Sequence, residues 1–246
     1  MTSVRPGALP GLFLCIDNAD RRRILSAWEE KHMADKLTRE DVLAMCAAKL
    51  AGETADIWLN NADLSGLDLS ECDLRFAHLR EVNLSAANLQ RTSLSGADLQ
   101  MANLTLADLR NAQLYEANLG GADLSDANLT FAYLGRADLT GARLLGANMT
   151  MVDARKANLS LTDLRRTNLR EAKLSGAILE VADLTDAKLA GANLSMANAR
   201  NAKLVHANLN NADMHNVNLK GADLTQADTT GADLTGATMP DGSKHS

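Results

Sequence analysis

Residues 117–141 read ANLGG ADLSD ANLTF AYLGR ADLTG, which is one pentapeptide written five times. Each copy places alanine two residues before leucine, with Asp, Asn or Tyr between them and two variable residues after them. In an extended segment, alanine and leucine point to one side and the residue between them points to the other. Each copy is therefore expected to form a very short strand followed by a two-residue turn.

The same register continues in both directions, from Leu59 to Met239, over 37 successive leucine positions. Leucine occupies 31 of these positions, and alanine occupies 28 of the 37 positions two residues earlier. Glycine recurs at the second turn residue, for example at Gly66 and Gly141, where it suits the positive φ of a type II turn. A period of five fits neither an amphipathic helix nor simple strand alternation, so the pattern indicates a repeat architecture.

A four-sided coil follows if each turn bends the chain by about a right angle. Four pentapeptides then complete one coil, and coils stack about 4.8 Å apart, which gives about nine coils in a rod of about 43 Å. Leucine fills the narrow interior, and alanine beside it leaves the room that leucine needs. The core positions that we single out are Leu64, Leu84, Leu104, Leu124, Leu164, Leu184, Ala62 and Ala122.

The repeats resemble the pentapeptide-repeat family, whose consensus A(D/N)LXX is matched from about Ile57 to Met239. The closing GATMPDGS, Gly236 to Ser243, is similar to the ending of cyanobacterial-type members. The resemblance implies an all-β solenoid, a right-handed quadrilateral β-helix, in a bacterial protein. It implies little about function, because many members of the family have no known activity.

The chain divides into an N-terminal helical cap at residues 1–55, the β-helix at 56–239 and a polar tail at 240–246. A first helix is expected from Asp17 or Asn18 to about Lys36. It is longer than a cap requires, so packing on the solenoid, a dimer contact and a docking site all stay open as its role.

A second helix should begin at Thr38, where Asp41 completes a capping-box-like pair, and run to about Ala51. One face should cover the first coil, whose strand edges would otherwise stay unpaired. That face comprises Val42, Leu43, Cys46 and Leu50. At the other end, Pro240 removes a backbone donor and Asp241–Gly242 should turn the chain away from the last coil.

Net charge is −6 with both signs interspersed, so electrostatics favour neither direct nucleic-acid binding nor an anionic membrane. No apolar run approaches the roughly 18 residues of a membrane helix. The three cysteines, Cys15, Cys46 and Cys72, have no disulfide or zinc spacing, which fits a reducing cytoplasm.

A filled β-helix offers no cleft on its regular faces, whereas catalysis needs convergent groups in a pocket. The five histidines share no stack with Cys or Ser, and His206 and His215 should lie on different faces. We therefore expect no enzyme activity, no cofactor and no metal.

Residues twenty apart should stack on one face, which gathers apolar side chains at two places. The first cluster is Phe131, Tyr133 and Met151, and the second is Leu161, Ile178 and Val181. The densest basic run comprises Arg155, Lys156, Arg165, Arg166 and Arg170. Each cluster is either an ordinary surface feature or a partner contact, with an acidic partner in the case of the basic run.

The sequence therefore predicts a noncatalytic structural module, a rigid β-helical scaffold that docks a protein partner and that has the capacity to form a homodimer. The alternative is DNA mimicry toward a type II topoisomerase such as gyrase, which resemblance to the quinolone-resistance branch would imply. Charge weighs against the alternative. About 43 Å of duplex carries about 25 negative charges, whereas residues 57–239 hold 21 acidic and 16 basic side chains, a net charge of −5.

Overall fold

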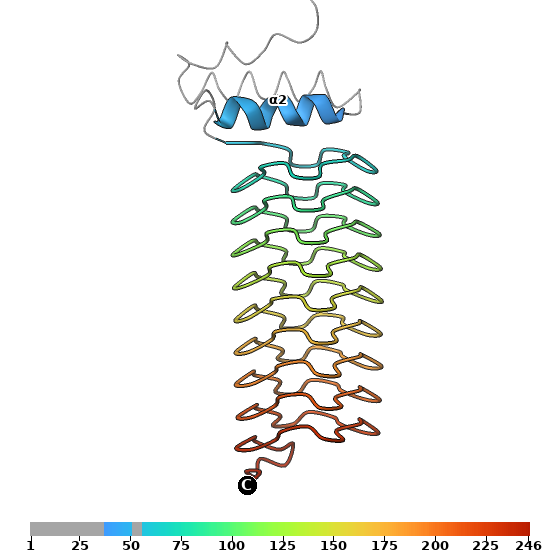
Figure 1. Cartoon of the computed structure of the whole chain (residues 1–246), viewed down its shortest axis with the longest axis vertical. Coiled ribbons are helices and arrows are strands. Elements are labelled where there is room, and N and C mark those ends of the chain that lie inside the picture. Colours follow the sequence, from blue (N-terminus) through green and yellow to red (C-terminus); the bar gives the residue numbers. More distant parts are fainter. Residues whose placement is uncertain (1–36, 51–55) are drawn as a thin grey trace, which may run out of the picture.

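The computed structural model describes residues 37–50 and 56–246 of the 246-residue chain. Helix α2, Arg39–Leu50, lies across one end of a straight stack of coils (Figure 1). The first helix expected from Asp17 or Asn18 to about Lys36 falls outside the described residues. Within the described ranges, no helix has the length and hydropathy needed to span a membrane.

Four repeats complete each coil of the solenoid. Trp58 forms a parallel bridge with His78, and every fifth residue repeats this pairing until Asn218 bridges Thr238. Partners in these parallel bridges are always twenty residues apart, so the register of the coils never slips. The expected β-helix of four repeats per coil, about nine coils in all, is therefore observed (Figure 1).

Each corner of the coil is a tight turn with a left-handed residue at its second variable position. In the turn after Leu64, the Leu67 amide donates to the Leu64 carbonyl at 3.2 Å. Gly66 has a φ of 69°, as the glycine pattern predicts, but Asn61 and Val181 have φ values of 60° and 61° at the same position. Since left-handed backbone is unfavourable for a β-branched residue such as Val181, the stacked coils must impose this conformation there.

The Asp or Asn at the middle of the repeat caps the turn that follows it. Asp63 Oδ1 accepts a hydrogen bond from the Ser65 amide at 3.0 Å. Asn128 Oδ1 accepts hydrogen bonds from the Thr130 amide at 3.1 Å and from the Thr130 hydroxyl at 2.6 Å. Asp and Asn side chains favour such turns because they offer an acceptor two residues before the amide.

The predicted core lies inside the coils. Its six leucines and Ala122 are at most 1% exposed, while Ala62 in the first coil is partly buried. Thr162 and Thr167, two of the three threonines at alanine positions, are also buried. Their hydroxyls donate to the Leu159 and Leu164 carbonyls at 2.6 Å, which satisfies the polar atoms inside the core.

Helix α2 begins with the expected capping pair. The Thr38 amide donates to Asp41 Oδ2 at 2.9 Å, and the Asp41 amide donates to Thr38 Oγ1 at 3.3 Å. Val42 and Cys46 are buried, but the prediction was wrong for Leu43, which is 39% exposed. Leu43 lies about 100° further around the helix axis than Val42, which turns it away from the buried side. Leu37, just before the helix, lies in the buried cluster with Val42 and Cys46.

Helix α2 contacts the first coil at two polar positions. The Cys46 and Cys72 thiols hydrogen-bond to each other, and this contact with burial raises the pKa of Cys46. An ion pair joins Arg39 to Asp68. The cysteines that sequence spacing left unconnected therefore meet between α2 and the first coil.

The C-terminal tail folds back instead of turning away, which corrects the expectation for Asp241–Gly242. The Gly242 amide donates to the Met239 carbonyl at 2.9 Å, and Gly242 has a φ of 89°. This turn reverses the chain, so that Thr238 forms an antiparallel bridge with Lys244. The tail thus pairs with one edge of the last coil.

Candidate functional site

One face of the β-helix collects most of the exposed aromatic side chains. Its central column consists of Gln113, Tyr133, Asp153 and Lys173, which bridge one another in successive coils. Two adjacent hollows lie on this face, and Tyr133 and Asp153 line both. We call the residues that line the hollows the Tyr133 face: Tyr115, Phe131, Tyr133, Gly135, Arg136, Met151, Asp153, Arg155, Lys156, Glu171 and Lys173.

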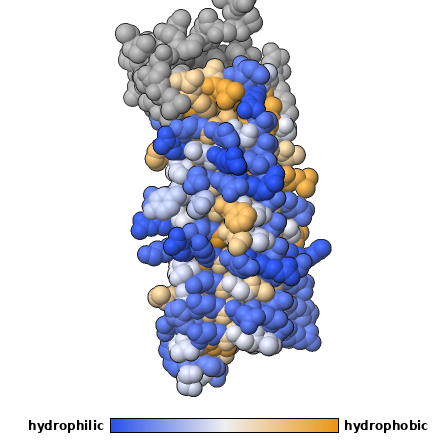
Figure 2. Space-filling view, in the orientation of Figure 1, coloured by the Kyte–Doolittle hydropathy of each residue, from blue (hydrophilic) through white to orange (hydrophobic). Residues whose placement is uncertain are grey.

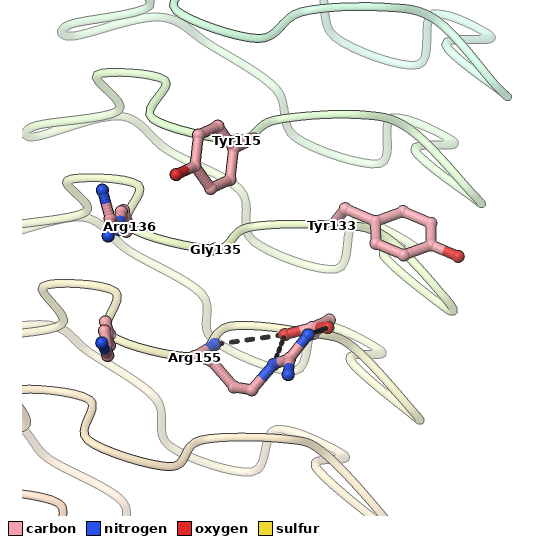
Figure 3. Close-up of a pocket in the computed structure, with 7 residues that line it drawn as sticks. Tyr115, Tyr133, Gly135, Arg136 and Arg155 are labelled. Atoms are coloured by element: carbon pink, nitrogen blue, oxygen red, sulfur yellow. Dashed lines mark hydrogen bonds and ion pairs between the residues drawn. The ribbon is translucent and has the colours of Figure 1, made fainter.

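The larger hollow, of about 290 Å³, lies between Tyr133 and the next corner. Figure 3 shows Tyr115, Gly135 and Arg155 one above another in successive coils, with Tyr133 on one side and Arg136 on the other. We call it the Tyr115 hollow. Its walls are two aromatic rings and the basic side chains of the corner.

Gly135 makes room for the ring of Tyr115. A β-carbon at Gly135 would lie 3.3 Å from Tyr115 Cδ2. Gly135 does not have a positive φ, so its contribution here is space rather than an unusual backbone conformation.

The smaller hollow, of about 160 Å³, lies on the other side of Tyr133 and is lined by Phe131 and Met151. We call it the Phe131 hollow. Phe131 and Tyr133 are each 48% exposed and Met151 is 40% exposed. The structure thus brings the three residues of this predicted cluster to one hollow, with their side chains exposed.

A bidentate ion pair with Asp153 holds the side chain of Arg155 against the face. Its Nε lies 2.8 Å from Asp153 Oδ1, and its Nη2 lies 2.6 Å from Asp153 Oδ2. The hydrogen bonds from Arg155 lower the pKa of Asp153, so the carboxylate stays charged at neutral pH. Such a planar fork fixes Arg155 in one geometry between the two hollows.

The second predicted apolar cluster lies on the neighbouring face. Ile178 bridges Asn158 and Asn198 there, and Leu161 and Val181 occupy the adjoining corner. All three side chains are exposed. Figure 2 shows that, on the face it displays, apolar side chains form separate small patches between hydrophilic ones.

The coil divides the predicted basic run among different corners. Arg155 and Lys156 line the Tyr115 hollow. Arg165 and Arg166 occupy a corner two repeats further on, where Arg165 pairs with Asp163 at 2.7 Å. Arg170 starts the next corner, and its amide donates to Asn168 at 3.5 Å. The basic run is thus not one continuous surface.

Tyr115, Gly135 and Lys173 belong to the site but were missed by the sequence analysis. Their signal was present in the twenty-residue spacing, which places Tyr115, Gly135 and Arg155 in one column. The first coil carries a further aromatic contact, the stacked rings of Trp58 and His78, whose centroids are 3.6 Å apart.

In the part of the chain that the structure describes, one group of possible metal ligands lies further along the same face. Ligand atoms of Asp213, His215 and Asp233 lie within 4.8 Å of one another, and His215 Nδ1 is 2.5 Å from Asp213 Oδ1. The three groups have the chemistry to hold a divalent cation. The sequence analysis compared the histidines with each other and with Cys and Ser but not with aspartates, so it missed this group. His206 occupies another corner, where it pairs with Asp186 at 3.3 Å.

The repeats match a known protein family. The family model for pentapeptide repeats finds eight copies that together extend over residues 58–241. The chain belongs to the pentapeptide-repeat family. Members of this family form the right-handed quadrilateral β-helix, in agreement with the four repeats per coil. No curated protein sequence matches the chain.

Solved structures of pentapeptide-repeat proteins are similar to this chain. HetL of Nostoc sp. strain PCC 7120, described as involved in heterocyst differentiation regulation, is 36% identical with a TM-score of 0.52, over 82% of this chain and 98% of HetL. Rfr23 of Cyanothece 51142 is 27% identical with a TM-score of 0.19, over 56% and 60%. Trypsin-treated QnrB1, a plasmid-mediated fluoroquinolone resistance protein, is 17% identical with a TM-score of 0.42, over 72% and 89%.

Proposed function

We propose that this protein is a noncatalytic docking module, a rigid β-helical scaffold that binds a protein partner through the Tyr133 face. The observation that carries the proposal is the concentration of aromatic side chains there. Of the five Trp, Tyr and Phe residues that the described ranges contain, both tyrosines and one phenylalanine lie on this face. Aromatic residues, Met and Arg are the residue types enriched at protein interfaces.

The rigidity of the face also supports docking. The Tyr133 amide donates to the Ala112 carbonyl at 2.9 Å, and the Leu134 amide donates to the Asp153 carbonyl at 2.7 Å. Each coil is therefore fixed to the coils on both sides. A surface that is already ordered loses little conformational entropy when a partner binds.

A regulatory setting is favoured by the similarity to HetL, which is described as taking part in the regulation of differentiation. The proposal extends to this chain only the general role, regulation through contact with another protein. The expected cytoplasmic location, bacterial source and capacity to form a homodimer stay predictions.

DNA mimicry toward a topoisomerase is the less favoured function. A mimic of duplex DNA presents a dense and continuous negative surface. The hollows of the Tyr133 face are instead lined by four basic and two acidic side chains. The surface that we propose for docking therefore carries a local excess of positive charge, whereas duplex DNA is negative.

Helix α2 is proposed to cap the N-terminal end of the solenoid. Leu37, Val42 and Cys46 share one buried cluster with the core of the coils. The Arg39–Asp68 ion pair and the Cys46–Cys72 contact fix the helix to the first coil. Covering the first coil removes an open strand edge that would invite end-to-end association.

The test is affinity purification of the tagged full-length chain from cells of its source organism, with two double variants. Phe131→Asn with Tyr133→Ser removes the aromatic contact, whereas Phe76→Asn with Met101→Asn removes two still more exposed apolar side chains that line neither hollow. Each new residue already occurs in the same column, as Asn111, Ser93, Asn216 and Asn61. We expect a partner retained by the control and lost by the face variant, whereas loss by both or by neither contradicts the proposal.

A further inference from the structure

We infer that the Tyr133 face binds an acidic polypeptide segment, in which carboxylates flank apolar or aromatic side chains. This inference rests on the proposed docking function and names the chemistry of the partner. Three observations carry it: the local excess of positive charge, the availability of two lysines, and the way each lysine shares a hollow with apolar side chains.

Positive charge is concentrated at the hollows. Arg136, Arg155, Lys156 and Lys173 line them, against Asp153 and Glu171. At the equivalent positions of the other coils, acidic side chains outnumber basic ones. The acidic residues there are Glu71, Asp73, Glu116, Asp213 and Asp233, and the basic residues are Arg75 and Arg91. Because the whole chain has a net charge of −6, an acidic partner would be attracted at this place and repelled elsewhere.

Two of the four basic groups are already engaged. Arg155 is paired with Asp153 at 2.6 Å, and Arg136 Nη1 lies 3.3 Å from Glu116 Oε1. Lys156 and Lys173 form no salt bridge of 4 Å or less with another residue in the described part of the chain. Lys173 is close enough to Asp153 to lower the pKa of that carboxyl, but neither lysine is paired at salt-bridge distance in the described ranges, so both can pair with carboxylates of a partner.

Each hollow combines one of these lysines with apolar walls. Lys156 lines the Tyr115 hollow together with both tyrosines. Lys173 lines the Phe131 hollow together with Phe131 and Met151. A segment with an apolar side chain next to a carboxylate places the apolar group against the apolar walls of a hollow and the carboxylate beside its lysine. A neutral or basic segment offers the lysine no carboxylate.

Single-stranded nucleic acid is the other ligand that combines stacking bases with negative charge. It fits less well because its phosphates follow a continuous backbone, and binding requires a groove of positive charge along that path. Here the path beyond the hollows meets Glu116 on one side and Asp213 on the other. An acidic peptide places its charges only where the two lysines lie.

The experiment uses fluorescence anisotropy with three labelled probes: a random copolymer of glutamate and tyrosine, a random copolymer of lysine and tyrosine, and an oligothymidine. The full-length protein is compared with Lys156→Glu/Lys173→Glu and with the control Lys188→Glu/Lys203→Glu. The two variants have the same net charge, but Lys188 and Lys203 bridge on other faces. We expect the glutamate copolymer to bind wild type and control, and to bind the face variant about tenfold more weakly.

The inference is overturned if the glutamate copolymer does not bind, if both variants weaken its binding equally, or if the lysine copolymer or the oligothymidine binds more tightly at this face. Its failure is distinct from failure of the docking function. A native partner lost with Phe131→Asn/Tyr133→Ser but not with the lysine reversals would leave the docking function in place and remove the acidic partner.

Discussion

Tyr115 lies over Gly135 of the next coil, close enough that a β-carbon on Gly135 would be 3.3 Å from the tyrosine Cδ2. The hollow beside Tyr133 includes this contact, and the ring would have to shift by a few tenths of an ångström to admit a β-carbon at position 135. The absence of a side chain at position 135 thus leaves room for the Tyr115 ring on an otherwise regular face.

Replacing Gly135 by Ala is expected to weaken partner binding several-fold, because the Tyr115 ring must tilt. The unfolding free energy should change by about 0.5 kcal/mol or less, since the site is on the surface. Gly120→Ala is the control, at the first turn position of another corner, where a β-carbon would lie 3.3 Å from Asn118 Oδ1. Equal affinity of the two variants in the anisotropy titration would contradict the role of Gly135.

Truncating a leucine inside the coil should be far more damaging than truncating one outside it. Leu124→Ala opens a cavity in a core position that is fully buried and should reduce stability by about 2–5 kcal/mol. Leu106→Ala, at an exposed corner, should change stability by about 0.5 kcal/mol or less. Urea unfolding followed by circular dichroism measures both, and similar values would show that the leucine column is not the core.

Gly141 isolates the backbone contribution of the corner. Its φ is 68°, and a β-carbon there would meet nothing within 4 Å. Gly141→Ala should therefore destabilise the protein by about 1 kcal/mol through the left-handed conformation alone. Gly141→Asn should cost less, since Asn tolerates this region, as Asn61 does in the same column at a φ of 60°. Equal unfolding free energies for the two variants would argue against backbone strain at the corners.

Acidification should destabilise the protein through its paired carboxylates. Hydrogen bonds from Arg165 lower the pKa of Asp163 in the folded state. A folded-state pKa below the unfolded value stabilises the protein above about pH 4, and this contribution is lost as the pH falls toward the folded-state pKa. Unfolding free energies measured from pH 7 to pH 2 should fall less steeply for Asp163→Asn than for wild type. An identical pH dependence would mean that the Arg165 pair contributes nothing.

The period of five was sufficient to predict the coil, because a fixed spacing of Ala and Leu translates directly into a fixed register. It also predicted that Phe131 and Met151 lie in one column, where both line the Phe131 hollow, since twenty residues make one coil. It did not predict the phase of helix α2, where Leu43 points to solvent, because that phase depends on the surface against which the helix packs.

The basic run shows a second limit of the sequence pattern. Lys156 and Arg166 are ten residues apart in the chain, but two repeats carry the chain to the opposite corner of the coil. Density along the sequence is therefore a poor guide to density on a β-helix, whereas spacing by twenty is a good one. The Tyr115 hollow could have been found by that rule, but the fold-back of the C-terminal tail could not, because it depends on one turn at Asp241–Gly242.

Site-specific photo-crosslinking tests most directly whether the Tyr133 face is the docking surface. The photoreactive amino acid p-benzoylphenylalanine would replace Tyr133 in one full-length protein and Met101, an exposed residue of another corner, in a second. After illumination of source cells, we predict a covalent adduct with one protein partner from position 133 and none with that partner from position 101. No adduct at position 133, or the same adduct from both positions, would contradict the account.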